Sequence, residues 1–285
     1  MPNDTVSMPN DTISVCYSGN KRVFPGLLLS VLSLAKFTAR PLHVFVLTMD
    51  LHEVDPAFVP FSEEQIRILD GVLKEKNGQS SACRVDVSEP FRRELADGKN
   101  TKNFYTPYTL LRLYLDGLEG LPDKIIYLDI DTMCASDIGQ LYDVDLGDAE
   151  YGAVLDYMGK FWINRHYCNA GVLLLNLKRI RQTKLFSRAR DYVCTHKLVM
   201  PDQTALHRLC TRRIYLPRRF NEQRGLHKDT VVKHFCRGIR WVPFFHIYNY
   251  KQWERDKVHK KLKIFYFDDL YEKYDELAAR YDLTK

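Results

Sequence analysis

The stretch that decides the fold is KIIYLDID, Lys124–Asp131, an apolar run that ends in two carboxylates one residue apart. The apolar, β-branched part is typical of a buried parallel strand, whose two faces are both covered. Asp129 and Asp131 then fall at the carboxyl edge of the sheet, where open α/β folds bind ligands. Neighbouring carboxylates repel each other unless a cation lies between them, so the pattern predicts a divalent ion that holds a phosphorylated ligand. An acidic turn at the strand end is the structural alternative.

On both sides of this stretch, apolar runs alternate with helical patterns, which predicts βαβ units and a parallel sheet with right-handed crossovers. The predicted strands are 13–16, 42–47, 83–87, 124–128, 151–155, 172–176 and 231–235. The predicted helices are 25–35, 63–76, 108–115, 185–196 and 202–209. No linker is long or polar enough to separate independent domains.

Composition narrows the class of protein. With 285 residues, 45% of them hydrophobic, the chain can bury one large core, alone or with a subdomain. A net charge of +6 favours anionic partners such as nucleotides, but it is spread along the chain, which argues against a nucleic-acid binder.

The cysteines and the lengths of the apolar runs indicate the cellular compartment and bear on whether zinc is bound. Seven dispersed cysteines without a Cys-x-x-Cys pair indicate reduced thiols, and zinc held by His166 with Cys168 or by His234 with Cys236 is the weak alternative. No apolar run reaches about 18 residues and the amino terminus shows no signal sequence, so we expect a cytoplasmic protein. The near-repeat MPNDTVS–MPNDTIS predicts that residues 1–12 are disordered.

Four ordered motifs between residues 13 and 241 resemble glycosyltransferase family 8, which includes glycogenin and the galactosyl- and glucosyltransferases of bacterial lipopolysaccharide assembly. The first is YTPY with Arg112, followed by LPDKIIYLDIDT, Asp137-Ile138 and Leu141. The others are YCNAGVLLLNL (Tyr167–Leu177), PDQTALHRL (Pro201–Leu209) and VVKHFCRG (Val231–Gly238).

The resemblance implies a GT-A fold: one Rossmann-like α/β domain, 13–245, with a mixed, mainly parallel sheet flanked by helices. Residues 246–285 would form a helical, aromatic extension packed on it. The implied activity is retaining transfer of glucose or galactose from a UDP-sugar, with Mn²⁺, to a glycan or glycolipid hydroxyl in bacterial cell-surface polysaccharide or lipopolysaccharide assembly. A catalytically silent nucleotide-sugar-binding module is the alternative.

The resemblance assigns the metal to Asp129, Asp131 and His234. Two carboxylates and an imidazole suit Mn²⁺ better than Mg²⁺, although Mg²⁺ stays open. A strand-end histidine bonded to a backbone group is the structural alternative for His234.

Three residues are implied at the reacting centre. Asn169 would touch the donor sugar or the acceptor, Asp202 would bind donor hydroxyls, and Gln203 would lie beside the anomeric carbon. Because an amide oxygen is a feeble nucleophile, we favour same-face attack, with the departing phosphate taking the acceptor's proton. Asp202 as a helix N-cap is compatible with this role. Asp156 matches a position of the acceptor pocket.

The remaining donor contacts also come from the resemblance. They are Tyr17, Ser18, Asn20, Arg112, Asp129, Ile130, Asp131, Gly238 and Arg240. Arg112 would orient a carboxylate and contact sugar or phosphate, and Arg240 stands where relatives have a phosphate-binding lysine.

Some positions depart from the family pattern. After the first strand, many relatives carry an acidic pair followed by Asn, but this chain has Tyr17-Ser18-Gly19-Asn20. Only Asn20 matches, and Tyr17 or Ser18 would take part in base contact. Thr204 replaces an acid after Asp202-Gln203.

The basic, aromatic tail from Trp253 to Phe267 suggests either peripheral membrane contact or a helical cap on the sheet. We favour the cap, because the acidic residues that follow would repel an anionic surface.

Overall fold

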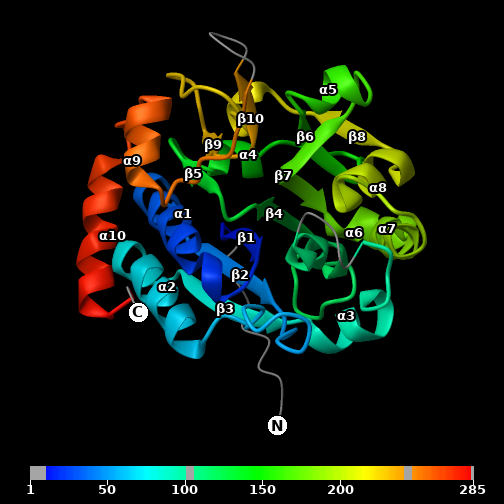
Figure 1. Cartoon of the computed structure of the whole chain (residues 1–285), viewed down its shortest axis with the longest axis horizontal. Coiled ribbons are helices and arrows are strands. Elements are labelled where there is room, and N and C mark those ends of the chain that lie inside the picture. Colours follow the sequence, from blue (N-terminus) through cyan, green and yellow to red (C-terminus); the bar gives the residue numbers. More distant parts are fainter. Residues whose placement is uncertain (1–10, 101–105, 241–245, 284–285) are drawn as a thin grey trace.

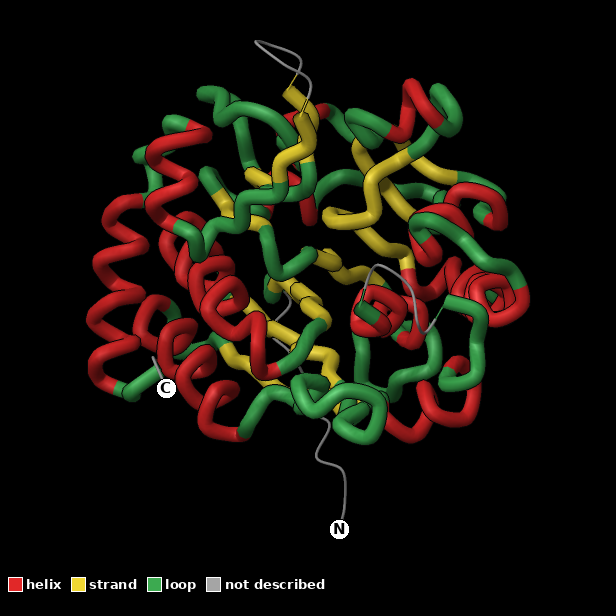
Figure 2. The backbone as a smooth tube through the Cα atoms, in the orientation of Figure 1, coloured by secondary structure: helices red, strands yellow, loops and turns green. Residues whose placement is uncertain are grey.

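A computed structural model describes residues 11–100, 106–240 and 246–283, without the side chains of Arg240 and His246. Residues 1–10, most of the segment expected to be disordered, lie outside the described part. Figures 1 and 2 show one twisted sheet with helices on both faces. The prediction of a mixed, mainly parallel α/β sheet is confirmed.

The central sheet has seven strands in the order β3-β2-β1-β4-β7-β6-β8. β7 is antiparallel to both of its neighbours, β4 and β6, and every other neighbouring pair is parallel. The strands are β1 Ile13–Ser18, β2 Leu42–Thr48, β3 Ser81–Asp86, β4 Lys124–Leu128, β6 Tyr151–Leu155, β7 Cys168–Asn176 and β8 Arg213–Tyr215.

Alternation along each strand divides the core into two layers. Ile126 and Leu128 of β4 pack toward the cluster that contains α1, whereas Ile125 and Tyr127 pack toward the opposite cluster. Helices α1 and α2 lie on the first face in Figure 1, and α10 packs on the outer side of α1. Helices α3, α6 and α7 lie on the second side together with the η2 helix.

The helices begin and end near their predicted limits where capping signals are strong. Helix α2 spans Glu63–Lys76, as predicted, because Ser62 and Gln65 form a reciprocal capping box. The other helices are α1 Phe24–Phe37, α3 Ser88–Leu95, α4 Gly139–Tyr142, α5 Gly159–Trp162, α6 Leu177–Thr183, α7 Leu185–Thr195, α8 Pro201–Leu209, α9 Arg255–Lys257 and α10 Asp268–Arg280. Shorter 3-10 and π segments are η1 Lys21–Val23, η2 Pro107–Tyr114, η3 Arg218–Phe220 and η4 Val258–Leu262.

The last predicted strand does not join the central sheet. β9, Val232–His234, pairs with β5, Thr132–Cys134, so that His234 lies opposite Thr132. A second small sheet joins β10, Gly238–Arg240, to β11, His246–Tyr248. The β5–β9 pairing brings residue 234 back to the end of β4.

Much of the tail packs against the domain. Val258, Phe267 and Tyr271 belong to the core cluster around α1, whereas Phe265 and Tyr266 are exposed. In the described part of the chain, none of the helices combines the length and apolar character that a membrane crossing requires. The domain boundary at residue 245 and the membrane contact stay predictions, and nothing in the structure supports the latter.

Candidate active site

A pocket of about 610 Å³ lies at the carboxyl ends of β1 and β4, where the strand order reverses. Crevices at such switch points are the usual ligand sites of open α/β sheets. The ends of the two strands are joined across the pocket floor, because Ser18 Oγ lies 2.6 Å from the Tyr127 hydroxyl. The volume is in the range of small-molecule sites.

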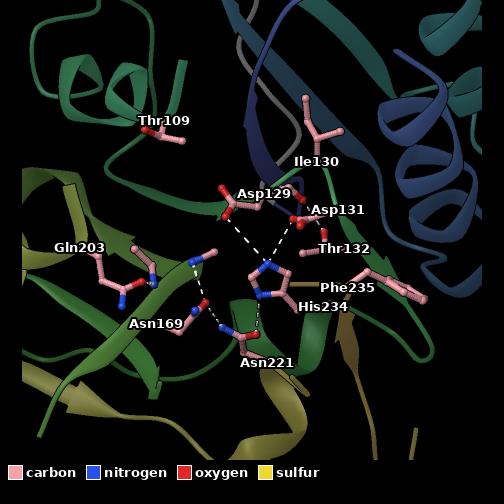
Figure 3. A network of polar contacts seen from close by, with 12 residues as sticks. Thr109, Asp129, Ile130, Asp131, Thr132, Asn169, Gln203, Asn221, His234 and Phe235 are labelled. Carbon is pink, nitrogen blue, oxygen red and sulfur yellow. Dashed lines mark hydrogen bonds and ion pairs between the residues drawn. The ribbon is translucent and has the colours of Figure 1, made fainter. Parts of the chain in front are cut away.

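Asp129, Asp131 and His234 converge in this pocket, and Figure 3 shows their side chains pointing toward one another. One potential ligand atom from each lies within 4.8 Å of the others. His234 Nε2 is 3.1 Å from Asp131 Oδ1 and 3.9 Å from Asp129 Oδ2. His234 Nδ1 lies 3.1 Å from Asn221 Oδ1, so a proton donated there leaves the Nε2 lone pair facing the carboxylates.

Gly171 makes room for this group. A Cβ atom there would lie 2.2 Å from His234 Cε1 and 2.8 Å from Asp129 Oδ2. The Gly171 carbonyl accepts the Asp129 N–H at 2.7 Å, which fixes the two strands at close approach. The space and the mixed nitrogen–oxygen donor set fit a divalent transition metal. Neither Cys168 nor Cys236 belongs to this group.

Arg112 lies beneath the carboxylates, with 2% of its side chain exposed. It donates to Asp129 Oδ1 at 2.8 Å, its Nε is 3.2 Å from Asp202 Oδ2, and it bonds the Ala170 carbonyl. Its guanidinium stacks 4.1 Å from the centre of the Tyr127 ring. Burial works against its charge, but Asp129, Tyr127 and Asp202 together raise the pKa of Arg112, which therefore stays a fixed cation. Burial raises the pKa of Asp202 despite Arg112.

Lys251, which the sequence analysis missed, contacts the carboxylate oxygen of Asp131 that His234 does not. Its ammonium forms an ion pair with Asp131 Oδ2. Burial alone would raise the pKa of Asp131, but Lys251 and His234 outweigh it and hold that pKa well below its usual range.

Two of the three residues expected at the reacting centre, Asn169 and Gln203, form an amide–carboxylate network with Asp156, whereas Asp202 pairs with Arg112. Asn169 Nδ2 and Gln203 Nε2 both donate to Asp156 Oδ2, at 2.9 and 3.2 Å. Gln203 Oε1 accepts the Ala170 N–H at 3.0 Å, and Asn169 Oδ1 accepts from Asn221. The carbonyl oxygen of Gln203 is therefore already engaged by a backbone donor.

Most of the predicted donor contacts lie at the pocket. Ser18, Asn20, Ile130 and Gly238 line it. Tyr17 does not, because it alternates with Ser18 along β1: its side chain is buried on the α1 face, with the hydroxyl 2.8 Å from Ser30 Oγ. The side chain of Arg240 lies outside the described part of the structure.

The sequence reading also missed Asn221, which lies in an irregular segment with no recognisable pattern. Thr204, which replaces an acid of the family pattern, has its Oγ1 2.8 Å from the Tyr167 hydroxyl.

Comparisons with known proteins agree on family and fold. A sequence profile of glycosyl transferase family 8 matches residues 14–257. A lipopolysaccharide 1,2-glucosyltransferase of Escherichia coli K12 is 32% identical over 124 residues, or 39% of this chain and 37% of that enzyme.

A protein of Haemophilus influenzae, provisionally named a glycosyltransferase, is 22% identical over 80% of this chain and 72% of its own length. The galactosyltransferase LgtC, solved with donor and acceptor sugar analogues, superimposes with a TM-score of 0.61 at 20% identity, over 93% of this chain and 96% of LgtC. The fold is therefore the predicted GT-A fold.

Proposed function

The chain belongs to glycosyl transferase family 8, and from that premise we propose that it transfers glucose or galactose from a UDP-sugar to a hydroxyl of a glycan or glycolipid, with retention at the anomeric carbon. The observation that carries the proposal is the pocket itself. It places Asp129, Asp131 and His234 in the same cavity as Asp202, Gln203 and Asn169.

Asp129, Asp131 and His234 would hold Mn²⁺, with Mg²⁺ as the alternative occupant. When bound there, the ion supplies positive charge that stabilises the diphosphate as the sugar leaves. Arg112 fixes the orientation of Asp129 through the 2.8 Å bond, so the carboxylate is held in place before any ligand arrives.

If the transfer is retaining, Gln203 bears on the route by which configuration is kept. A double displacement needs a nucleophile on the face opposite the leaving group. Gln203 Oε1 is a weakly nucleophilic amide oxygen and is already bonded to Ala170 N–H. Same-face attack by the acceptor hydroxyl, with its proton passing to the departing phosphate, is the reaction that these residues support.

The pocket divides into a donor end and an acceptor end. Ser18 and Asn20 would contact the nucleoside, whereas Asp156 and Asn169, bonded to each other at 2.9 Å, would face the sugar and the incoming hydroxyl. Next to Asp156 the pocket is lined by Tyr157 and Met158, which lead into α5.

An exposed apolar tip at α5 supports an acceptor with a lipid part. Phe161 and Trp162 are 73% and 70% exposed, and Ile163 follows them. Lys160 lies over the Phe161 ring at 5.0 Å, so the tip carries apolar surface with a neighbouring cation. A glycolipid combines an anionic or polar head with hydrocarbon, which matches that pattern. The E. coli relative, named for lipopolysaccharide, favours the same acceptor class.

The proposal is tested by incubating the protein with UDP-glucose or UDP-galactose and Mn²⁺, and following sugar release and its anomeric configuration by proton NMR. We expect α-configured sugar from the α-linked donor and no release after chelation. Asp129→Asn and His234→Ala should abolish release, while Asp148→Asn, which changes an exposed ion pair with Arg212, should not.

Donor binding without turnover, for every nucleotide sugar tried with and without glycan acceptors, would favour the silent binding module. Inversion of configuration would contradict the retaining mechanism.

A further inference from the structure

The ion pair between Lys251 and Asp131 lies inside the candidate metal group and joins residues 120 positions apart in sequence. Lys251 Nζ also lies 3.4 Å from the Phe235 carbonyl, next to His234. The side chain is 24% exposed, so one side of the ammonium faces the pocket.

The backbone that carries Lys251 is fastened to the site. The neighbouring Gln252 is fully buried, and its Nε2 donates to the Ile130 carbonyl at 2.5 Å and to Gly26 at 3.2 Å. Ile130 is the residue between the two aspartates. The Tyr271 hydroxyl donates to the Gln252 carbonyl at 2.7 Å, which ties the same turn to α10. These bonds hold the base of the lysine at a fixed place beside Asp131.

Each of the two aspartates therefore has its own cation. Arg112 pairs with Asp129 from below, and its 2%-exposed side chain cannot leave. Lys251 pairs with Asp131 at the pocket side, through a long, flexible stem. A divalent ion that takes Asp131 meets this ammonium at close range, and the two positive charges repel. The repulsion is relieved when the ammonium moves to another anion, and a diphosphate in the pocket is such an anion.

We propose that Lys251 neutralises Asp131 while the site holds no ion, and that it moves to the diphosphate of the donor when a divalent ion binds. Metal and nucleotide diphosphate then bind cooperatively. The diphosphate draws the Lys251 ammonium away from the ion, and the ion takes Asp131 and so releases Lys251 to bind the diphosphate. The inference rests on the proposed function, since it requires a nucleotide diphosphate and a metal in this pocket.

The test measures two equilibria on the whole chain: Mn²⁺ alone, from the free-ion signal in electron paramagnetic resonance, and UDP at saturating Mn²⁺, by calorimetry. For Lys251→Met we expect Mn²⁺ alone to bind more tightly, by about fivefold or more, and UDP with Mn²⁺ to bind about tenfold more weakly. Lys251→Arg, which keeps the charge, should retain much of the cooperativity. The matched control is Lys36→Met, which removes an ion pair with Asp269 outside the pocket and should leave both values unchanged.

Tighter Mn²⁺ binding together with weaker UDP binding in Lys251→Met would distinguish this role from a merely structural one. Weakening of both ligands, or no change in either, would overturn the role of Lys251 while leaving the proposed function intact. If the unaltered protein binds neither Mn²⁺ nor UDP, the proposed function itself fails, and the inference with it.

Discussion

At the scale of single residues, the site depends on a missing side chain as much as on the ligands present. Gly171 lies where any Cβ would overlap the His234 ring and the Asp129 carboxylate. To accommodate a Cβ at residue 171, either the His234 and Asp129 side chains or strand β7 must move. Either movement changes the geometry of the groups that would bind a metal.

Gly171→Ala should therefore impair metal binding more than folding. We expect a 10- to 100-fold loss in Mn²⁺ affinity and a loss of about 1–3 kcal/mol in the free energy of unfolding, from overpacking. Metal titration and urea unfolding measure the two effects. The control is Gly71→Ala in α2, where a Cβ meets nothing within 4 Å and a gain of about 0.5–1 kcal/mol is expected. Unchanged metal affinity in Gly171→Ala would contradict this account.

Lys233 gives a prediction about pH. It is buried, with its ammonium bonded to the carbonyls of Glu222 and His234, and burial lowers its pKa from 10.5 to about 8. Between these values the unfolded chain binds more protons than the folded one, so this lysine makes stability rise with pH.

Relative to Lys233→Met, the free energy of unfolding of the unaltered protein should rise between pH 8 and 10.5, by at most about 1.4 kcal/mol per pH unit. Below pH 8 the difference should stay constant. Urea unfolding of both proteins at several pH values measures the difference, and a flat difference across the window would show that burial does not lower the pKa of Lys233.

At the scale of elements, the sequence predicted the limits of those helices and strands whose ends are determined by neighbouring residues. β4, β6 and α2 have their predicted limits, the last because Ser62 and Gln65 cap it. The strand near residue 233 was also expected, but local pattern carries no information about its partner, β5. For the same reason the contact of Lys251 with Asp131 was not predicted, since it depends on a turn fixed by Gln252 from far along the chain.

The α5 tip gives the prediction that belongs to this scale. Phe161→Ser with Trp162→Ser should raise the KM for a lipid-linked acceptor severalfold and leave donor hydrolysis unchanged, because the tip lies beyond the reacting centre. The control is Phe265→Ser with Tyr266→Ser, which changes a similarly exposed aromatic pair in the tail. If the tail variant loses acceptor affinity and the tip variant does not, the tail is the acceptor contact.

At the scale of the whole molecule, the site unites segments that lie far apart in sequence. Asp129 and Asp131 come from the end of β4, His234 from β9, and Lys251 from the turn after β11. The family resemblance of ordered motifs predicted the first three as one group, and the fold brings their side chains together. It could not identify Asn221 or show that Tyr17 faces away, because these depend on packing between elements.

Ligand binding should therefore stabilise the folded chain as a unit. With Mn²⁺ and UDP each at about 100 times its dissociation constant, we expect the midpoint of thermal unfolding to rise by at least about 5 °C. Differential scanning fluorimetry measures the shift, and Asp129→Asn should lose it. A rise with UDP alone that chelation does not reduce would contradict a metal-dependent site.

The reversed strand β7 has a consequence for how such enzymes diversify. Because β6 ends and β7 begins at the pocket, the segment between them, from Asp156 to Tyr167, is a hairpin with both roots anchored at the rim. The parallel half of the sheet, with β1 and β4, holds the opposite wall. Lengthening or reshaping that hairpin would leave the wall formed by β1 and β4 in place. Under the proposed division of the pocket, one scaffold could therefore be fitted to new sugar recipients by editing a single loop.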